Sequence, residues 1–469
     1  MAIRFHNTYT RDLEAFQPLD PAGKTVKLYT CGPTVYNYAH IGNFRAYLFE
    51  DLLQRHLELR GFEVNRVMNL TDVDDKTIRG CHAAGLPLAE FTQKYKNAFF
   101  EDLKTLRVKP AMTFPSATDP VYIERMIEMI THLVAHGYAY QAEDRSVYFR
   151  LNKFPDYGKL AHLNLEELRP TGRIANDEYE KESIGDFALW KAWDQADGDV
   201  AWESPWGKGR PGWHIECSAM ATALLGPEID IHCGGVDNIF PHHEAEIAQS
   251  ECCTGHRFVR TWLHCAHLMV ENQKMSKSAG NFYTLRDLLE KGWSGRELRY
   301  VLLSVNYRLP LNFTFESLAA ARAALARIDE WVTRLTEKAA GAAASQHPLA
   351  THTRFEEALD DDLNISAALG ALFDVIRESN RAFDRGEITP GDAKALLDWW
   401  QRINSVLQFQ RDEEAVPQAV PQAVLDLAAA RAAARAAKNW AQSDEIRAQI
   451  DAAGWIVKDS KDGQKLTRK

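Results

Sequence analysis

The order of hydrophobic and polar positions predicts alternating strands and helices at the start of the chain. Residues 25–30 mix β-branched and aromatic side chains, as a short strand does. Residues 44–59 carry apolar side chains at helical spacing, residues 63–70 again have a strand pattern, and residues 86–106 have a helical one. A strand, a helix and a second strand in this order predict a parallel β-α-β unit.

The pattern changes after residue 115. A helix is predicted over residues 121–136 and a short strand over residues 146–151, among polar turns. Strand and helix patterns return at residues 229–232 and 241–249, where a proline opens the helix. The middle of the chain is therefore predicted to be an insertion between two halves of one sheet.

Beyond residue 285 the pattern is almost wholly helical. Residues 338–348 are typical of a linker or helix break, and a proline-spaced repeat over residues 416–424 marks the clearest domain boundary. The last segment, residues 421–469, has nine Lys and Arg against six Asp and Glu, in a chain whose net charge is −10. This local positive charge is a weak indication of a nucleic-acid partner, because a small helical domain with a charged surface has the same composition.

Composition narrows the class of protein. A chain of 469 residues is too long for one core, so about two to four domains are expected. No apolar run of about 18 residues occurs, and the N-terminus lacks the apolar segment of a signal peptide, so a cytoplasmic protein with no membrane partner is expected. Seven cysteines without a secretory signal favour thiols or metal ligands over a disulfide framework.

The first candidate site is the segment TCGPTVYNYAHIGN, residues 30–43. A strand that leads through a glycine-containing turn into a helix forms an anion site, because unpaired backbone N–H groups and the helix dipole face the ligand. His40 and Asn43 are three residues apart and can point at the same phosphate. A polar turn in an ordinary α/β domain is an equal alternative.

Two further segments carry charged groups. Thr71-Asp-Val-Asp-Asp-Lys76 follows a predicted strand, where open α/β sheets place their ligand crevice, although a helix N-cap also explains one or two of these acids. The loop KMSKS offers the ammonium groups of Lys274 and Lys277. Mobile lysines suit a reaction that develops charge on a leaving pyrophosphate, whereas a solvated turn is the ordinary explanation of such a pair.

A set of metal-binding side chains is the third candidate. Cys31, Cys217, His242 and Glu246 combine two thiols, an imidazole and a carboxylate, which favour zinc over magnesium or calcium. His242 and Glu246 are four residues apart and share one helix face. The ligands are distant in sequence, so a buried cysteine and a structural histidine remain the more economical explanation on spacing alone.

Together these motifs resemble those of the class I aminoacyl-tRNA synthetases, which carry a HIGH signature near the start and KMSKS near the end of a split Rossmann domain. The chain is most similar to the cysteinyl-tRNA synthetase family. The similarity spans essentially the whole chain in the family's order, through CGPTVYNYAHIGNFR (31–45), NLTDVDDK (69–76), GWHIECSAM (212–220), IHCGGVDNIFPHHEAEIAQS (231–250), KMSKSAGNF (274–282) and KNWAQSDEIR (438–447).

The resemblance implies an α/β fold, in which a split Rossmann (HUP-type) catalytic domain carries an inserted connective domain and is followed by all-α C-terminal domains. The implied bounds are residues 1–114 and 206–283 for the two Rossmann halves, 115–205 for the insertion, 284–345 for a helical stem-contact region, 346–412 for a helical bundle and 421–469 for a small anticodon-binding domain.

The resemblance also implies roles for individual residues. The ligands of one zinc ion per chain are then Cys31, Cys217, His242 and Glu246. The cysteine-binding residues are Thr71, Trp213 and Asp237, the last holding the substrate ammonium. The ATP-binding residues are His40, Gly42, Asn43 and Lys277, and the catalytic set is His40, Asn43, Lys274 and Lys277. The anticodon contacts are Arg435, Trp440, Asp444 and Asp459, although helix packing explains Trp440 equally well.

The implied reaction is the activation of L-cysteine with ATP–Mg²⁺ and its transfer to tRNA(Cys) by a monomeric enzyme. A zinc ion that binds the substrate thiolate separates cysteine from serine, so no editing domain is expected. The chain departs from the family at Asn43, where histidine is usual, and at Ala245, where asparagine is common. An asparagine amide still donates to a phosphate oxygen but carries no charge.

Two other functions are compatible with parts of the sequence. A cysteine ligase that transfers cysteine to an amino sugar shares the catalytic core but lacks an anticodon domain, and the basic segment 421–469 speaks against it. A catalytically silent paralogue, a zinc-containing RNA-binding or regulatory protein, is supported only by Asn43, and the intact KMSKS loop and candidate metal ligands speak against it.

Overall fold

The computed structural model describes residues 2–163, 185–276, 279–351, 353–411, 421–437, 439–460 and 463–468. The chain divides into two compact units, Met1–Phe409 and Gln410–Lys469, which are described separately. Among the described residues, no helix combines the length and the apolar character that crossing a bilayer requires.

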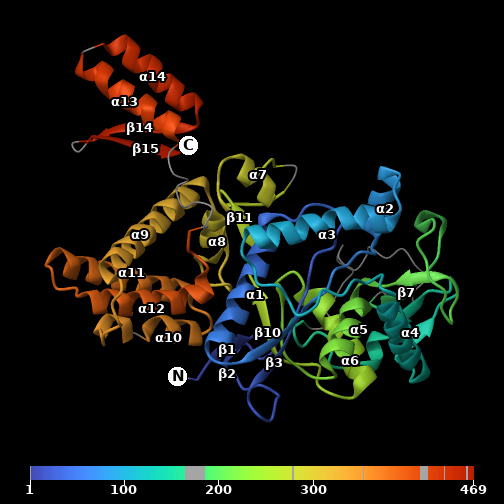
Figure 1. Ribbon diagram of the computed structural model, residues 1–469. Helices are drawn as coiled ribbons and strands as arrows, with labels where there is room; N and C mark the ends of the chain where they lie inside the picture. Colours follow the sequence, from blue (N-terminus) through green and yellow to red (C-terminus); the bar gives the residue numbers. More distant parts are fainter. Residues whose placement is uncertain are drawn as a thin grey trace. The chain divides into compact units, whose positions relative to one another are not determined.

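A four-stranded parallel sheet in the order β10-β9-β3-β4 forms the centre of the first unit (Figure 1). Its strands are β3 (Thr25–Thr30), β4 (Glu63–Met68), β9 (Ile229–Gly235) and β10 (Val259–Cys265). The central pair joins residues far apart in sequence, since Leu28 lies opposite Ile231 and Thr30 opposite Cys233. The predicted two halves of one sheet are confirmed. The strand order reverses between β3 and β9, and a ligand crevice is expected beyond the carboxyl ends of these strands.

Helices connect these strands. The predicted first helix is α1 (Ile41–Leu59), and α5 (Trp213–Leu225) and α6 (Glu244–Thr254) accompany the second half of the sheet. The helix expected to open at Pro241 begins as an irregular turn over Ile239–His243, in which Phe240 has non-helical backbone angles, and regular helix starts at Glu244.

The segment between the sheet halves starts with three helices, α2 (Asp75–Ala84), α3 (Leu88–Thr105) and α4 (Pro120–Ala135). A separate antiparallel sheet follows, in the order β5-β6-β7-β8. Its strands are β5 (Ala139–Gln141), β6 (Val147–Phe149), β7 (Phe187–Ala192) and β8 (Gly209–Pro211), with a short turn of 3₁₀ helix over Leu151–Lys153 and another over Gln195–Asp197. Of these strands the sequence pattern predicted only β6, and it indicated the start of α2 only as the alternative explanation of the acids after Thr71.

The remainder of the first unit is mostly helical, as predicted. A small sheet in the order β12-β11-β13 contains β11 (Leu268–Val270), β12 (Gln273–Lys274) and β13 (Leu311–Phe313). The helices are α7 (Leu285–Glu290), α8 (Gly295–Leu303), α9 (Phe315–Ala339), α10 (Arg354–Asp360), α11 (Ile365–Asp384) and α12 (Pro390–Leu407), with a 3₁₀ turn over Pro348–Thr351. A hairpin of β1 (Arg4–Asn7) and β2 (Asp12–Ala15) precedes the sheet.

Helix α1 joins the sheet to the helical bundle. It packs against β4, β9 and β10 on one side and against α8 and α12 on the other. One hydrophobic core runs from Leu28 in β3 through Leu48 in α1 to Trp331 and Trp400 in the bundle. The helix that begins at the glycine-containing turn is therefore held by both parts of the unit.

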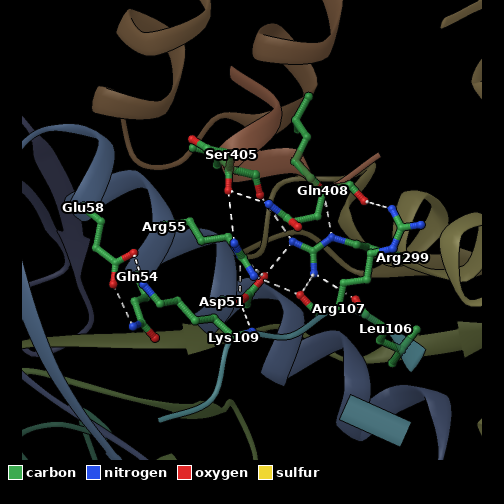
Figure 2. A network of polar contacts seen from close by, with 12 residues as sticks. Asp51, Gln54, Arg55, Glu58, Leu106, Arg107, Lys109, Arg299, Ser405 and Gln408 are labelled. Carbon is green, nitrogen blue, oxygen red and sulfur yellow. Dashed lines mark hydrogen bonds and ion pairs between the residues drawn. The ribbon is translucent and has the colours of Figure 1, made fainter. Parts of the chain in front are cut away.

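Arginines surround the carboxyl end of α12 (Figure 2). Arg299 is fully buried and donates to the carbonyl oxygen of Leu407 at 2.7 Å and to the carboxylate of Asp51 in α1 at 2.6 Å. Arg55 and Arg107 donate to the carbonyl oxygens of Ser405 and Gln408. These bonds satisfy carbonyls that the helix end leaves without intrahelical partners, and they lie where the helix dipole favours positive charge.

The second unit contains α13 (Gln422–Ala436), α14 (Trp440–Ala452), β14 (Trp455–Ser460) and β15 (Gly463–Arg468). The two strands form an antiparallel hairpin. Val424, Ile446, Ile450, Trp455 and Val457 make its core. The prediction of a helical C-terminal region is thus confirmed. The prediction that its domains are all-α is wrong for the last one, because that domain ends in a β-hairpin. Trp455 and Val457 are two residues apart and face the core together, as the two-residue period of a strand requires.

Candidate active site

The first signature forms the N-terminus of α1. His40 is the N-cap: its Nδ1 accepts from the backbone N–H of Asn43 at 3.3 Å, and the Asn43 side-chain oxygen accepts from the backbone N–H of His40 at 3.1 Å. The two side chains therefore cap the helix reciprocally. Burial lowers the pKa of His40, and because Nδ1 accepts a hydrogen bond, the proton of the neutral ring lies on Nε2.

Described residues on both sides of the KMSKS loop lie against this signature. The backbone N–H of Ile41 donates to the carbonyl oxygen of Tyr283, and the ring of Phe282 packs edge-on against His40. A Cβ atom on Gly42 would lie 3.0 Å from the His40 ring and 3.3 Å from the side chain of Met275, so this glycine allows the close approach. Two motifs more than 230 residues apart are thus brought together.

Of the two predicted lysines, one is described by the structure. Lys274 is exposed in β12, and its carbonyl oxygen accepts from the side chain of Asn281 at 3.2 Å. Asn281 also accepts from the backbone N–H of Ser276 at 2.8 Å and so closes the loop. Lys277 lies outside the described residues.

The four predicted metal ligands converge. Cys31 follows β3, Cys217 lies on α5, His242 precedes α6 and Glu246 lies on its first turn, and their ligand atoms are all within 4.8 Å of one another. His242 Nε2 is 3.1 Å from Glu246 Oε1 and 3.5 Å from Cys217 Sγ. All four side chains are buried. Their proximity supports a common site over an unrelated buried cysteine and histidine.

The site also contains histidines that the sequence analysis missed. His232 and His243, with Cys31 and Glu246, form a second group of possible ligands that shares two members with the first. His232 Nε2 lies 2.9 Å from Glu246 Oε2, and His243 Nδ1 lies 2.8 Å from His264 Nε2. Strand alternation in IHCGG and the doubled histidine in PHHE were the available signals. The first group contains two thiols and the second only one, so the first fits a thiophilic ion better.

Burial favours the neutral forms of the side chains in this cluster. Burial raises the pKa of Cys31, Cys217 and Glu246, and it lowers the pKa of His242, with the neighbouring histidines adding to the effect. Without a cation the carboxyl and the thiols are therefore driven toward their protonated forms. A divalent ion at this position reverses that preference, because it binds thiolate, carboxylate and neutral imidazole. All seven cysteines of the protein are free thiols, as predicted.

Of the residues expected around the substrate, Trp213 contacts one candidate ligand and Thr71 contacts the neighbour of another. The ring of Trp213 stacks on His242 with centroids 4.1 Å apart, and 40% of its surface remains exposed. Thr71 is buried and its hydroxyl donates to Glu216, the neighbour of Cys217, at 2.8 Å. Asp237 lies in the turn after β9, and a Cβ atom on Gly235 would lie 2.3 Å from its carboxylate. Ala245 is fully buried.

The acids after Thr71 have partners within the protein. Asp74 is the N-cap of α2, as the alternative predicted. Asp72 accepts from Lys96 at 2.6 Å and Asp75 pairs with Arg210 and Lys191. These acids hold α2 and α3 against neighbouring segments, and the local sequence did not show it because their partners lie 24 to 135 residues away.

In the second unit, taken by itself, the predicted anticodon contacts lie on different elements. Trp440 begins α14 and is 57% exposed, and the guanidinium of Arg435 lies 5.6 Å from the centre of its ring. Asp444 is in the same helix, and Asp459 is in β14. Trp440 is therefore not part of the core of this unit, and its ring is open on one side.

Solved structures of low sequence identity share the fold. A methionyl-tRNA synthetase of Mycobacterium tuberculosis aligns with a TM-score of 0.59 at 16% identity, covering 82% of this chain and 89% of that one. The LeuRS of Agrobacterium radiobacter in complex with tRNA aligns with a TM-score of 0.60 at 11% identity, covering 84% and 85%. The family model for tRNA synthetases class I (C) catalytic domain matches residues 16–323. The fold and the paired signatures thus define a class I aminoacyl-tRNA synthetase.

Two further family models match the rest of the chain, a DALR domain at residues 354–409 and a cysteinyl-tRNA ligase anticodon binding domain at residues 418–466. A cysteine–tRNA ligase of Protochlamydia amoebophila is 49% identical over 475 residues, which is 99% of this chain and 98% of that protein. One of Chlamydia pneumoniae is 50% identical over 472 residues, with the same coverage. The chain belongs to the cysteine–tRNA ligase family.

Proposed function

We propose that this protein activates L-cysteine with ATP and transfers it to the 3′ end of tRNA(Cys). An oxygen of the cysteine carboxylate attacks the α-phosphorus of ATP, which forms cysteinyl-adenylate and releases pyrophosphate. A hydroxyl of the terminal ribose of the tRNA then attacks the carbonyl carbon of this anhydride, and AMP leaves. The main support is the convergence of two thiols, an imidazole and a carboxylate beyond β3, the strand that leads into the signature helix.

We propose one zinc ion per chain, held by Cys31, Cys217, His242 and Glu246. The donor set fits this ion, because four buried N, S and O ligands from one compact group are the usual zinc environment. When bound, zinc accepts the thiolate of cysteine in preference to the hydroxyl of serine. ATP enters with Mg²⁺, which the phosphates carry.

The protein's own groups then bind and orient the substrates. Trp213 provides an aromatic wall beside His242, and Thr71 and Asp237 offer oxygen acceptors for the substrate ammonium. His40 presents its Nε2–H at the N-terminus of α1, where the helix dipole favours phosphate. Gly42 and Asn43 complete this turn, and Lys274 and Lys277 supply positive charge for the leaving pyrophosphate. Positioning and electrostatics account for the catalysis, and no covalent enzyme intermediate is required.

Cysteine-dependent exchange of pyrophosphate into ATP tests the activation step. We expect exchange with cysteine and none with serine, in a sample that contains about one zinc per chain. Exchange with both amino acids would contradict the proposed selection by zinc. No exchange in zinc-loaded protein would contradict the activity itself and would direct attention to Asn43.

A single substitution tests the metal ligands. Cys217→Ser replaces a thiolate with a hydroxyl that binds zinc weakly, so we expect zinc content and exchange to fall by about tenfold or more while the melting temperature changes little. Cys253→Ser is the matched control, because Cys253 lies at the C-terminal end of α6, far along the helix from Glu246, and is outside the cluster. Full activity and full zinc content in Cys217→Ser would refute the assignment.

The acceptor is proposed to be tRNA because the second unit matches an anticodon-binding model. In this proposal Arg435, Trp440, Asp444 and Asp459 contact the anticodon, where an exposed aromatic ring beside a guanidinium suits stacking on unpaired bases. We further propose that the enzyme acts as a cytoplasmic monomer with the domain bounds given above. Charging of an amino sugar instead of tRNA by the purified protein would identify the shorter type of cysteine ligase.

A further inference from the structure

A chain of hydrogen bonds connects the backbone of Gly32, which follows the candidate ligand Cys31, to Glu216, which precedes the candidate ligand Cys217. The backbone N–H of Gly32, next to Cys31, donates to Asn69 Oδ1 at 3.0 Å. Asn69 Nδ2 donates to Thr71 Oγ1 at 3.3 Å, and Thr71 Oγ1 donates to Glu216 Oε2 at 2.8 Å. Glu216 is the residue before Cys217. Asn69 and Thr71 are 2% exposed and Glu216 is fully buried.

The backbone around this chain is held closely. A Cβ atom on Gly32 would lie 1.7 Å from the carbonyl oxygen of Asn69, so only glycine fits there. The N–H of Val35 donates to the carbonyl oxygen of Thr71, and the N–H of Thr71 donates to that of Pro33. The segments that follow β3 and β4 are therefore joined side by side, and Thr71 cannot move independently of Cys31.

The direction of these bonds determines what the Thr71 hydroxyl can offer. An amide nitrogen such as Asn69 Nδ2 is only a donor, so it occupies a lone pair of the Thr71 oxygen. The single hydroxyl proton goes to Glu216, whose Oε2 accepts whether or not the other oxygen is protonated. The remaining lone pair of Thr71 is then an acceptor, which is the polarity that an ammonium group requires.

Glu216 has no other evident role in the described part of the protein. Its Oε2 is occupied by Thr71, its Oε1 has no partner among the described residues, and it is not a member of either possible metal group. A buried carboxyl with an unpaired oxygen costs free energy, so a purely structural position would favour an apolar side chain.

We propose that Glu216 and Asn69 are positioning residues for cysteine recognition. They orient the Thr71 hydroxyl so that its free lone pair faces the substrate ammonium, and they join this acceptor to the backbone of the two thiol ligands. The inference rests on the proposed activation of cysteine. The inference explains the buried Asn69 in NLTD, two residues before Thr71, and the buried Glu216 in WHIEC, next to Cys217.

The test compares two substitutions of Glu216 in the full-length, zinc-loaded enzyme by pyrophosphate exchange. Glu216→Met has similar size but no acceptor, and we expect the KM for cysteine to rise about tenfold, with kcat, the KM for ATP and zinc content unchanged. Glu216→Gln keeps an acceptor oxygen for Thr71, and we expect it to restore most of the affinity for cysteine. An unchanged KM in Glu216→Met overturns the proposal, and so does an equal loss in Glu216→Gln, since that outcome assigns the effect to charge.

A double-variant cycle separates positioning from a general structural role. Thr71→Val removes the hydroxyl at nearly constant volume, and adding Glu216→Met to it should raise the KM for cysteine no further. Additive effects would show that Glu216 acts independently of Thr71 and would overturn the proposal. Asn69→Asp provides a second probe if Glu216→Met does not fold, because it keeps the acceptor for Gly32 and removes the donor to Thr71, and the same rise in KM is expected. Absence of exchange in the wild-type enzyme would instead refute the proposed function.

Discussion

The buried arginine at the end of α12 allows a quantitative test of how the helical bundle is attached. Arg299→Met keeps the length and the apolar stem of the side chain but removes its donors. The variant loses the bond to Asp51 at 2.6 Å, the bond to the carbonyl oxygen of Leu407 at 2.7 Å and that to the carbonyl oxygen of Leu106 at 3.0 Å (Figure 2). These groups lie in three different segments, so one substitution loosens α1, α12 and the turn after α3 together.

The magnitude follows from burial. Removing one partner of a buried ion pair costs about 3–5 kcal/mol, and each buried carbonyl left without a donor adds about 1–3 kcal/mol. Asp51 keeps Arg55 and the backbone N–H of Lys109 as partners. The cost of breaking its ion pair with Arg299 therefore lies at the lower end of the range for buried ion pairs. We therefore expect a destabilisation of at least about 5 kcal/mol, a large part of the about 5–15 kcal/mol that holds a typical protein folded.

Urea unfolding followed by tryptophan fluorescence measures this loss, because Trp399 and Trp400 lie in α12 and Trp331 in α9. Hydrogen exchange should show the largest increase over residues 390–407. Arg385→Met is the matched control, since Arg385 is exposed and, within the described part of the chain, pairs only with the exposed Glu387 at 2.7 Å, and no measurable change is expected. A loss below about 1 kcal/mol in Arg299→Met would refute this account.

Two further predictions concern buried positions near the sheet. Burial, opposed by Arg66, raises the pKa of Glu50 from 4.5 to about 8. Between these two pH values the folded state retains a proton that the unfolded state releases. The free energy of unfolding should therefore fall by roughly 4–5 kcal/mol as the pH rises from 4.5 to about 8. Glu50→Gln should remove this slope, and parallel melting temperatures of the two proteins from pH 5 to pH 8 would contradict it. Gly32→Ala places a methyl group on the carbonyl oxygen of Asn69, so we expect loss of bound zinc together with a lower melting temperature. Gly370→Ala in α11 is the control: a Cβ atom there meets no neighbouring atom within 4 Å, so the variant should be neutral or slightly stabilising. Zinc content and calorimetry on both glycine variants check this.

Local patterns predicted the elements that have local causes. Thr25–Thr30 and α1 follow from side-chain periodicity, and the turn between them follows from its glycines and its capping residues. The strands β5, β7 and β8 were missed because each is short and is stabilised by partners distant in sequence, and the partners of the acids at the start of α2 were missed for the second reason. Asp75, for example, is explained by Arg210 rather than by its neighbours.

The sequence by itself determined the family, the order of strand and helix around the signatures, and the kinds of ligand atom that can bind a metal, because these depend on residue type and on spacing within one element. Only the tertiary structure decided that Cys31, Cys217, His242 and Glu246 meet, that His232 and His243 lie beside them, and that Glu216 reaches Thr71. The physical reason is the parallel pairing of β3 with β9, which brings residues about 200 positions apart to one edge of the sheet. No local periodicity encodes that pairing, since it depends on packing α1, α5 and α6 around a sheet assembled from both halves of the chain.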